Sequence, residues 1–188
     1  FMIRNLMFTL AGLALVSPMA ARADVVTDWN TTLNNAIIDT PSKHNPGNPT
    51  RAMAMMNGAI YDVFQSINRT HVPFKINVLA PGANRDAAVA QAAYLVISNT
   101  EGEKQARLVT VLAERLNAIP DSPAKTAGIA LGTTIGQHYV GLHASDSLTD
   151  PNYTPTIAPG HWSPDPMITP DQKGWGSDWG DIHPWSMP

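Results

Sequence analysis

The chain has 188 residues, of which 12 are Lys or Arg and 15 are Asp or Glu, so its formal net charge is −3. It has no basic stripe, which argues against nucleic-acid binding, and no cysteine, which excludes a zinc site built from thiolates. Its length predicts a single domain.

The first 23 residues have the three parts of a secretory signal peptide. Arg4 supplies a positive charge, an apolar run extends from Leu6 to Val16, and Ala21-Arg22-Ala23 forms a small-x-small cleavage site. The run is too short to cross a bilayer as a helix; the alternatives are a short membrane anchor and a buried first helix. We expect cleavage before Asp24, a periplasmic or secreted location, and no stable membrane span afterwards.

Residues 24–146 are predicted to form a helical domain. A first helix over about 26–40 has an apolar face, and the prolines and glycine of residues 41–49 end it. That face comprises Trp29, Leu33, Ala36 and Ile37.

A second helix is predicted from Asn48, a good N-cap, and Pro49, which suits the first helical position. Pro73 marks the end of this region. Its apolar stripe indicates a face against the core, although methionine-rich stripes can also form adaptable binding surfaces. The stripe comprises Met53, Met56, Ile60, Val63 and Ile67.

Asp62 lies on this second helix, beside Tyr61. We expect it to cap a neighbouring group or to form a salt bridge with a neighbour such as Arg51 or Arg69, rather than to act as a catalytic acid, because most such ion pairs are structural.

An alanine-rich helix is predicted over about 86–99, and another is predicted to begin at Glu101. Glu101 and Glu103 are expected to lie at a solvated helix start. The expected buried positions are Val89, Ala92, Ala93 and Val96 in the first of these helices, and Leu108, Leu112 and Leu116 in the second.

A last helix over about 123–145 is predicted from Ser122 as N-cap and Pro123 at the first position. Glycines recur at spacing four, at Gly128, Gly132 and Gly136. Each glycine costs a helix about 1 kcal/mol relative to alanine, so three on one face predict a close contact with another helix. An adjacent apolar stripe comprises Leu131, Ile135, His138 or Tyr139, and Leu142.

No segment alternates convincingly as a strand, so the predicted fold is all-α, a bundle of about five helices. Residues 147–188 follow as an irregular ribbon, because the five prolines within 159–185 exclude a long helix. The ribbon holds four of the five tryptophans, which we expect to be partly exposed unless another surface covers them. These are Trp162, Trp175, Trp179 and Trp185.

No catalytic, cofactor-binding or metal-binding residue is predicted in this chain. His138 and His143 are five residues apart, so they lack the i, i+4 spacing of a zinc helix. No phosphate-binding loop or G-x-S-x-G elbow occurs. The most compact group of basic side chains comprises Lys43, His44 and Arg51.

Several segments in order resemble a known family. They are "NPTRAMAMMNGAIYDVFQSIN" (48–68) followed by "VPF", the alanine-rich "DAAVAQAAYLVI" (86–97), and "GIALGTTIGQHYVGLHASDS" (128–147), which ends in a His-x-x-Asp-type turn. "PGHWSPDP", with the later "WG" and "HPW", completes the series. Together they resemble the N-terminal half of bacterial vanadium-dependent haloperoxidase-like proteins, within the type-2 phosphatidic acid phosphatase superfamily.

The resemblance implies that the complete protein oxidises halide with hydrogen peroxide, using vanadate as cofactor, and that the ribbon connects to a second half. It places the oxyanion site in that half, where Lys and Arg side chains, a Pro-Ser-Gly-His segment and a Ser-Arg segment hold the anion. "PSKH" (41–44) lacks the glycine of that motif. We therefore expect this chain to be the N-terminal half of the complete protein, with the missing C-terminal half as its partner. On its own, the chain is expected to be inactive and to bind no vanadate.

Two alternatives stay open. One is an acid phosphatase of the same superfamily, which would use the same oxyanion pocket. The other is a stand-alone secreted helical module for binding or scaffolding.

Overall fold

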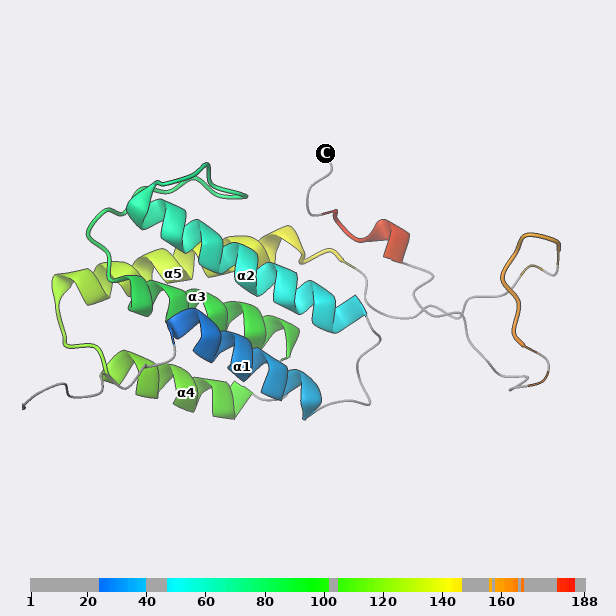
Figure 1. The fold of residues 1–188 in the computed structure, drawn as a ribbon, viewed down its shortest axis with the longest axis horizontal. Coiled ribbons are helices and arrows are strands. Elements are labelled where there is room, and N and C mark those ends of the chain that lie inside the picture. Colours follow the sequence, from blue (N-terminus) through cyan, green and yellow to red (C-terminus); the bar gives the residue numbers. More distant parts are fainter. Residues whose placement is uncertain are drawn as a thin grey trace, which may run out of the picture.

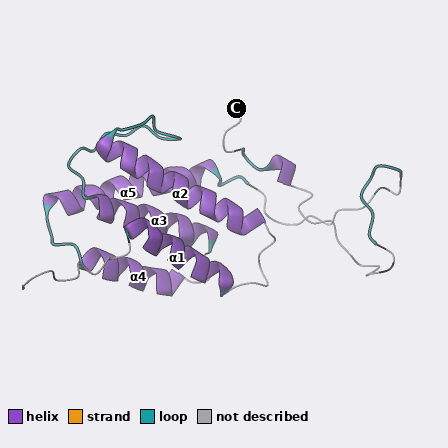
Figure 2. Cartoon of the chain, viewed as in Figure 1, coloured by secondary structure: helices purple, strands orange, loops and turns teal. Residues whose placement is uncertain are grey.

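The computed structural model describes residues 24–39, 47–101, 105–146, 156, 158–165, 167 and 179–184. In these ranges the fold is all-α, as predicted, and no strand occurs (Figure 2). The helices are α1 (Val25–Ile38), α2 (Gly47–Asn68), α3 (Arg85–Thr100), α4 (Gln105–Asn117) and α5 (Pro123–Leu142), and Trp179–Asp181 form a short 3₁₀ turn. The predicted signal peptide, with Lys43, His44, Glu103, Trp175 and Trp185, lies outside the described residues.

Helix α3 lies in the middle of the bundle and contacts each of the other four helices (Figure 1). Its alanines allow this position, because small side chains let neighbouring helices approach closely on several sides. The four predicted buried residues are buried, and Asn84 caps the helix by accepting a 2.9 Å hydrogen bond from Ala87 N. Those four are Val89, Ala92, Ala93 and Val96.

The glycine stripe of α5 packs against α3, which confirms the predicted helix contact. A methyl group at Gly128 would overlap the carbonyl oxygen of Asn84, and one at Gly132 would overlap that of Ala88. At Gly136 it would come within 3.0 Å of Leu95 Cβ. Ser122 is the N-cap of α5, as predicted, and accepts from Lys125 N at 3.2 Å.

Helix α2 differs from the prediction in its first residue and in the exposure of Met53. The helix begins at Gly47 rather than after Asn48, because Pro49 can stand anywhere in the first turn, where backbone N–H groups have no intrahelical partner. Met53 is 38% exposed, whereas Met55 is fully buried. The buried side of α2 is wider than the predicted stripe, since both α3 and α5 pack on it.

The start of α4 also differs from the prediction. Glu101 is the C-cap of α3 rather than the first residue of α4, and it is buried rather than solvated. Its backbone N–H donates to Ile97 O at 2.7 Å, which continues the α3 hydrogen-bonding pattern by one residue. Leu108 is buried, and Leu112 and Leu116 are partly buried against the core, as predicted.

The described parts of the C-terminal ribbon contain one segment that contacts the bundle. Trp179 lies against Gly47 at the start of α2, where a methyl group would overlap the indole ring. Trp162, in contrast, is 40% exposed. Among the described helices, none is both long and apolar enough to cross a membrane.

Candidate functional site

A buried carboxylate organises the junction between α2, α5 and the loop that follows α2. Asp62 is fully buried. Its Oδ1 accepts from Phe74 N at 2.6 Å, and its Oδ2 accepts from Lys75 N at 2.9 Å and Ile76 N at 3.2 Å. Tyr139 of α5 donates its hydroxyl to the same Oδ2 at 2.8 Å. The carboxylate thus has four donors, three of them backbone amides.

Of the two roles expected for Asp62, the salt bridge with Arg51 or Arg69 is wrong, and Asp62 instead caps backbone N–H groups. Arg69 instead donates to Asn77 Oδ1 at 2.7 Å and Val78 O at 3.3 Å within the same loop. Backbone amides replace a cation here because the loop returns over the end of α2 and brings three successive N–H groups to one carboxylate. Asp62 therefore holds the backbone of the following loop rather than an arginine side chain.

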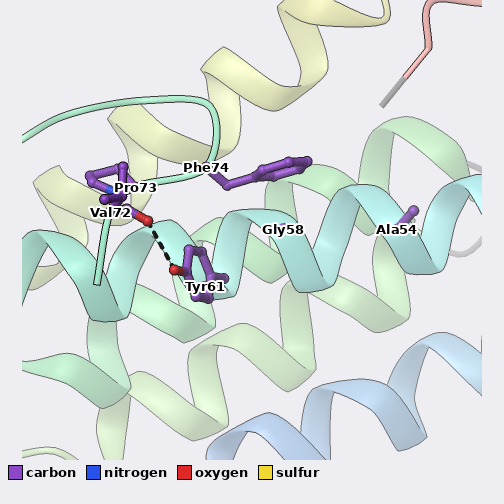
Figure 3. Close-up of a pocket in the computed structure, with 6 residues that line it drawn as sticks. All are labelled: Ala54, Gly58, Tyr61, Val72, Pro73 and Phe74. Carbon is purple, nitrogen blue, oxygen red and sulfur yellow. Dashed lines mark hydrogen bonds between the residues drawn. The ribbon is translucent and has the colours of Figure 1, made fainter. Parts of the chain in front are cut away.

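The loop held by Asp62 forms one wall of an apolar hollow of about 500 Å³. Figure 3 shows Val72, Pro73 and Phe74 of the loop lying over α2, and Tyr61 donating a 2.9 Å hydrogen bond to Val72 O. The floor is helix α2, with Gly58 between the hollow and the Tyr139 ring. The six lining residues are Ala54, Gly58, Tyr61, Val72, Pro73 and Phe74.

A second polar cluster joins the start of α2 to the end of α5. Arg51 Nε donates to Asp146 Oδ2 at 3.0 Å, and Arg51 Nη2 donates to the His143 carbonyl at 3.1 Å. His143 Nδ1 lies 2.7 Å from the same Asp146 oxygen. The side chains of Arg51 and Asp146 are 7% and 2% exposed, so this ion pair is shielded from solvent.

The C-terminal segment completes this cluster. The backbone N–H of His183 donates to Asp146 Oδ1 at 3.1 Å, and its ring stands edge-on to His143 with centroids 5.9 Å apart. Asp146 therefore connects three parts of the chain that are distant in sequence: α2, the turn after α5 and the segment 179–184.

Burial and charge set the protonation of this cluster. Burial lowers the pKa of His143, an effect that outweighs the opposite influence of Asp146. Burial acts to raise the pKa of Asp146, but the hydrogen bonds from His183 N–H, His143 and Arg51 lower it on balance. A neutral His143 therefore donates its Nδ1 proton to an ionised Asp146.

The basic group of Lys43, His44 and Arg51 falls only partly within the described residues. Lys43 and His44 lie outside them, and Arg51 points its donors inward to Asp146 and His143. The two histidines of α5 and its C-cap point to different environments, His138 beside the Tyr139 ring and His143 toward Asp146. Among the described residues, no three His, Asp or Glu side chains are grouped so that they could hold a metal ion.

Sequence reasoning missed the partners in both clusters. Tyr139 and Asp62 are 77 residues apart, and Arg51 and Asp146 are 95 apart, so no local spacing signals either pair. The one local signal was the His-x-x-Asp turn, which is the pair His143 and Asp146.

Comparison of the chain with protein-family models, with curated proteins and with solved structures gave no match in any of the three.

Proposed function

We propose that this chain is the N-terminal helical part of an exported vanadium-dependent haloperoxidase-like enzyme, whose vanadate-binding groups belong to a second helical half of the complete protein. The resemblance of segments 48–68, 86–97 and 128–147 to that family motivates the proposal. In it, the bundle supports the second half and the ribbon leads the chain toward it.

The observation that carries the proposal is the contact between the segments that bear the resemblance. Segments 48–68 and 128–147 correspond to α2 and to α5 with its turn, and they meet through two buried polar links. One is Tyr139 with Asp62, and the other is Arg51 with Asp146.

The arginines bear on where vanadate would bind. An oxyanion of this charge needs several converging cations and donors. Each arginine in the described ranges has an acceptor within the chain, and no two of them share an acceptor, so these side chains do not converge on one acceptor group. The acceptors are Asp146 for Arg51, Asn77 for Arg69, Asp86 for Arg85, Asp39 for Arg107 and Asp28 for Arg115. This pattern supports a vanadate site on another segment of the complete protein.

The test begins with the reading frame downstream of residue 188 in the gene. Its complete exported product is assayed for bromide oxidation by hydrogen peroxide, with and without vanadate, and for hydrolysis of a phosphomonoester. Vanadate-dependent bromide oxidation by the complete product, absent from residues 24–188 alone, is the expected result.

Three results would contradict the proposal. A mature product with the mass of residues 24–188 and no response to vanadate would favour a stand-alone module. Tight vanadate binding by residues 24–188, lost in Lys43→Gln or His44→Gln, would place a working oxyanion site in this part. Phosphomonoester hydrolysis without bromide oxidation would favour the phosphatase.

A further inference from the structure

The loop between α2 and α3 exposes apolar side chains although its backbone is firmly held. Val72 is 82% exposed, Leu79 is 69% exposed and Phe74 is 45% exposed. Backbone amides of this loop bond to Asp62, His71 N donates to Gln65 Oε1 at 2.7 Å, and Ala80 N donates to Ser66 O at 2.9 Å. The exposed apolar surface therefore has a fixed shape.

The hollow beneath this loop is open to solvent and has a mainly apolar lining. Its volume of about 500 Å³ lies within the range of about 300–1,000 Å³ typical of ligand pockets. Its main side-chain polar group, the Tyr61 hydroxyl, already donates to Val72 O (Figure 3). The interior therefore suits an apolar chain or ring and offers little to a polar one.

The solvent-accessible charged groups on residues 47–84 are all cationic. Asp62 is the only carboxylate within residues 47–84, and it is fully buried beneath the loop. The same loop carries Arg69 and Lys75, and Lys75 Nζ lies 4.9 Å from the ring centroid of Phe74, which lines the hollow. A ligand with an acidic group finds a cation at this wall and no exposed acid on residues 47–84 to repel it.

We propose that this hollow binds a small amphiphilic anion, with its apolar part against Ala54 and Gly58 and its acidic group near Lys75. The chemical class is a monomeric medium-chain or aromatic carboxylate. This site goes beyond the proposed function and does not depend on it, because every residue that forms it belongs to α2 and the loop after it.

The test uses nuclear magnetic resonance of the ¹⁵N-labelled chain, titrated with octanoate and, in parallel, with octylammonium. Octanoate is expected to shift the amide signals of Ala54 and Gly58 in a saturable way. Its affinity should exceed that of octylammonium by about fivefold or more, since two charges about 4 Å apart in water interact by about 1 kcal/mol. Lys75→Gln should remove most of this preference and leave the folded spectrum intact.

Ala54→Leu fills the hollow from a helical position and should abolish the saturable shift at Gly58. Ala113→Leu is the matched control, because it adds the same bulk at an exposed position of α4 and should bind octanoate as the parent does. Equal affinity for the two amphiphiles, undiminished binding by Ala54→Leu, or no octanoate binding would each overturn the proposal. Anionic phosphatidylglycerol vesicles form a further arm. Vesicle binding that Ala54→Leu leaves unchanged, without octanoate binding, would assign the surface to a bilayer and contradict the site.

Discussion

Tyr139 donates its hydroxyl to Asp62 at a place where both side chains are fully buried, 77 residues apart in sequence. Gly58 makes the contact possible, since a methyl group there would lie 2.8 Å from the Tyr139 ring. Burial, with Asp62 beside it, raises the pKa of Tyr139, so this hydroxyl stays protonated and remains a donor. One hydrogen bond thereby joins α5 to the carboxylate that holds the loop after α2.

Tyr139→Phe should lower the free energy of unfolding by about 1.5–3 kcal/mol, the usual contribution of a hydrogen bond to a charged group. Urea unfolding followed by circular dichroism measures the loss. Tyr61→Phe is the control, because its hydroxyl bonds Val72 O at an exposed site, where the loss should be smaller. Equal losses of unfolding free energy in the two variants would mean that the buried hydrogen bond stabilises the fold no more than the exposed one.

Gly132→Ala should destabilise the protein by about 1–3 kcal/mol, as overpacking does, since the added methyl group would overlap Ala88 O. Gly141→Ala, in the same helix with no atom within 4 Å of the added group, should instead stabilise by up to about 1 kcal/mol through helix propensity. Thermal melts of both variants provide the measurement. A Gly132→Ala variant as stable as Gly141→Ala would show that the α3–α5 contact is looser than described.

Stability should fall as the pH drops from about 7 to about 5, because His143 is neutral when folded and takes up a proton when unfolded. The sign follows from the lowered pKa of His143, whose ordinary value is 6.5: below that value the unfolded chain binds the extra proton. The lowered pKa of Asp146 adds a further loss below its ordinary value of 3.8.

Urea midpoints across this pH range measure the effect. His143→Gln should be less stable at neutral pH, yet show a flatter pH dependence than the parent between about pH 7 and 5. His71→Gln removes an exposed histidine and should retain the parent's slope. An unchanged slope in His143→Gln would assign the pH dependence to another group.

Gly47→Ala should displace Trp179 from the start of α2, because the methyl group would occupy the position of the indole ring. The emission of Trp179, isolated by subtracting the spectrum of Trp179→Phe, should move to longer wavelength as the ring becomes hydrated. Gly180→Ala adds a methyl group with no atom within 4 Å and serves as the control. Unchanged emission in Gly47→Ala would argue that Trp179 does not rest on this helix.

N-terminal sequencing of the exported protein should begin at Asp24 if the predicted signal peptide is cleaved. Cleavage there leaves α1 whole, since the helix begins at Val25 and its first turn uses Asp24 O as acceptor from Asp28 N at 3.0 Å. Retention of Arg4 in exported material would contradict the prediction.

Local patterns were sufficient to predict the helices, and they failed where the answer depends on distant partners. Ser122 and Pro123 mark the start of α5 because capping involves neighbouring residues, and the glycine stripe shows which face meets another helix. The same rules could not give the exposure of Met53 or the burial of Glu101. Those depend on how α3 and α5 sit against α2, and on where the chain turns between α3 and α4.

The candidate site was less predictable than the fold for the same reason. Asp62 was expected to cap a neighbouring group or to pair with an arginine, but a helical sequence does not reveal that three amides of the following loop will reach its carboxylate. The cluster of Arg51, His143 and Asp146 likewise has one local pair and one distant member. When the partner of a side chain is a backbone group, or a residue 77 or 95 positions away in the sequence, the local residue pattern contains no signal for the contact.

Asp62 holds the loop after α2 through backbone N–H groups, which every residue except proline has. Main-chain amides of residues 74–76 are the donors, so a residue of α2 holds this backbone whatever side chains Phe74 and Lys75 carry, while the Ile76 side chain packs against the core. Residues such as Val72 and Leu79, which are mostly exposed, can change while the backbone path is retained. Over evolutionary time this surface can acquire new chemistry at little risk to folding, whereas a change at Asp62 would remove the acceptor of three backbone amides at once.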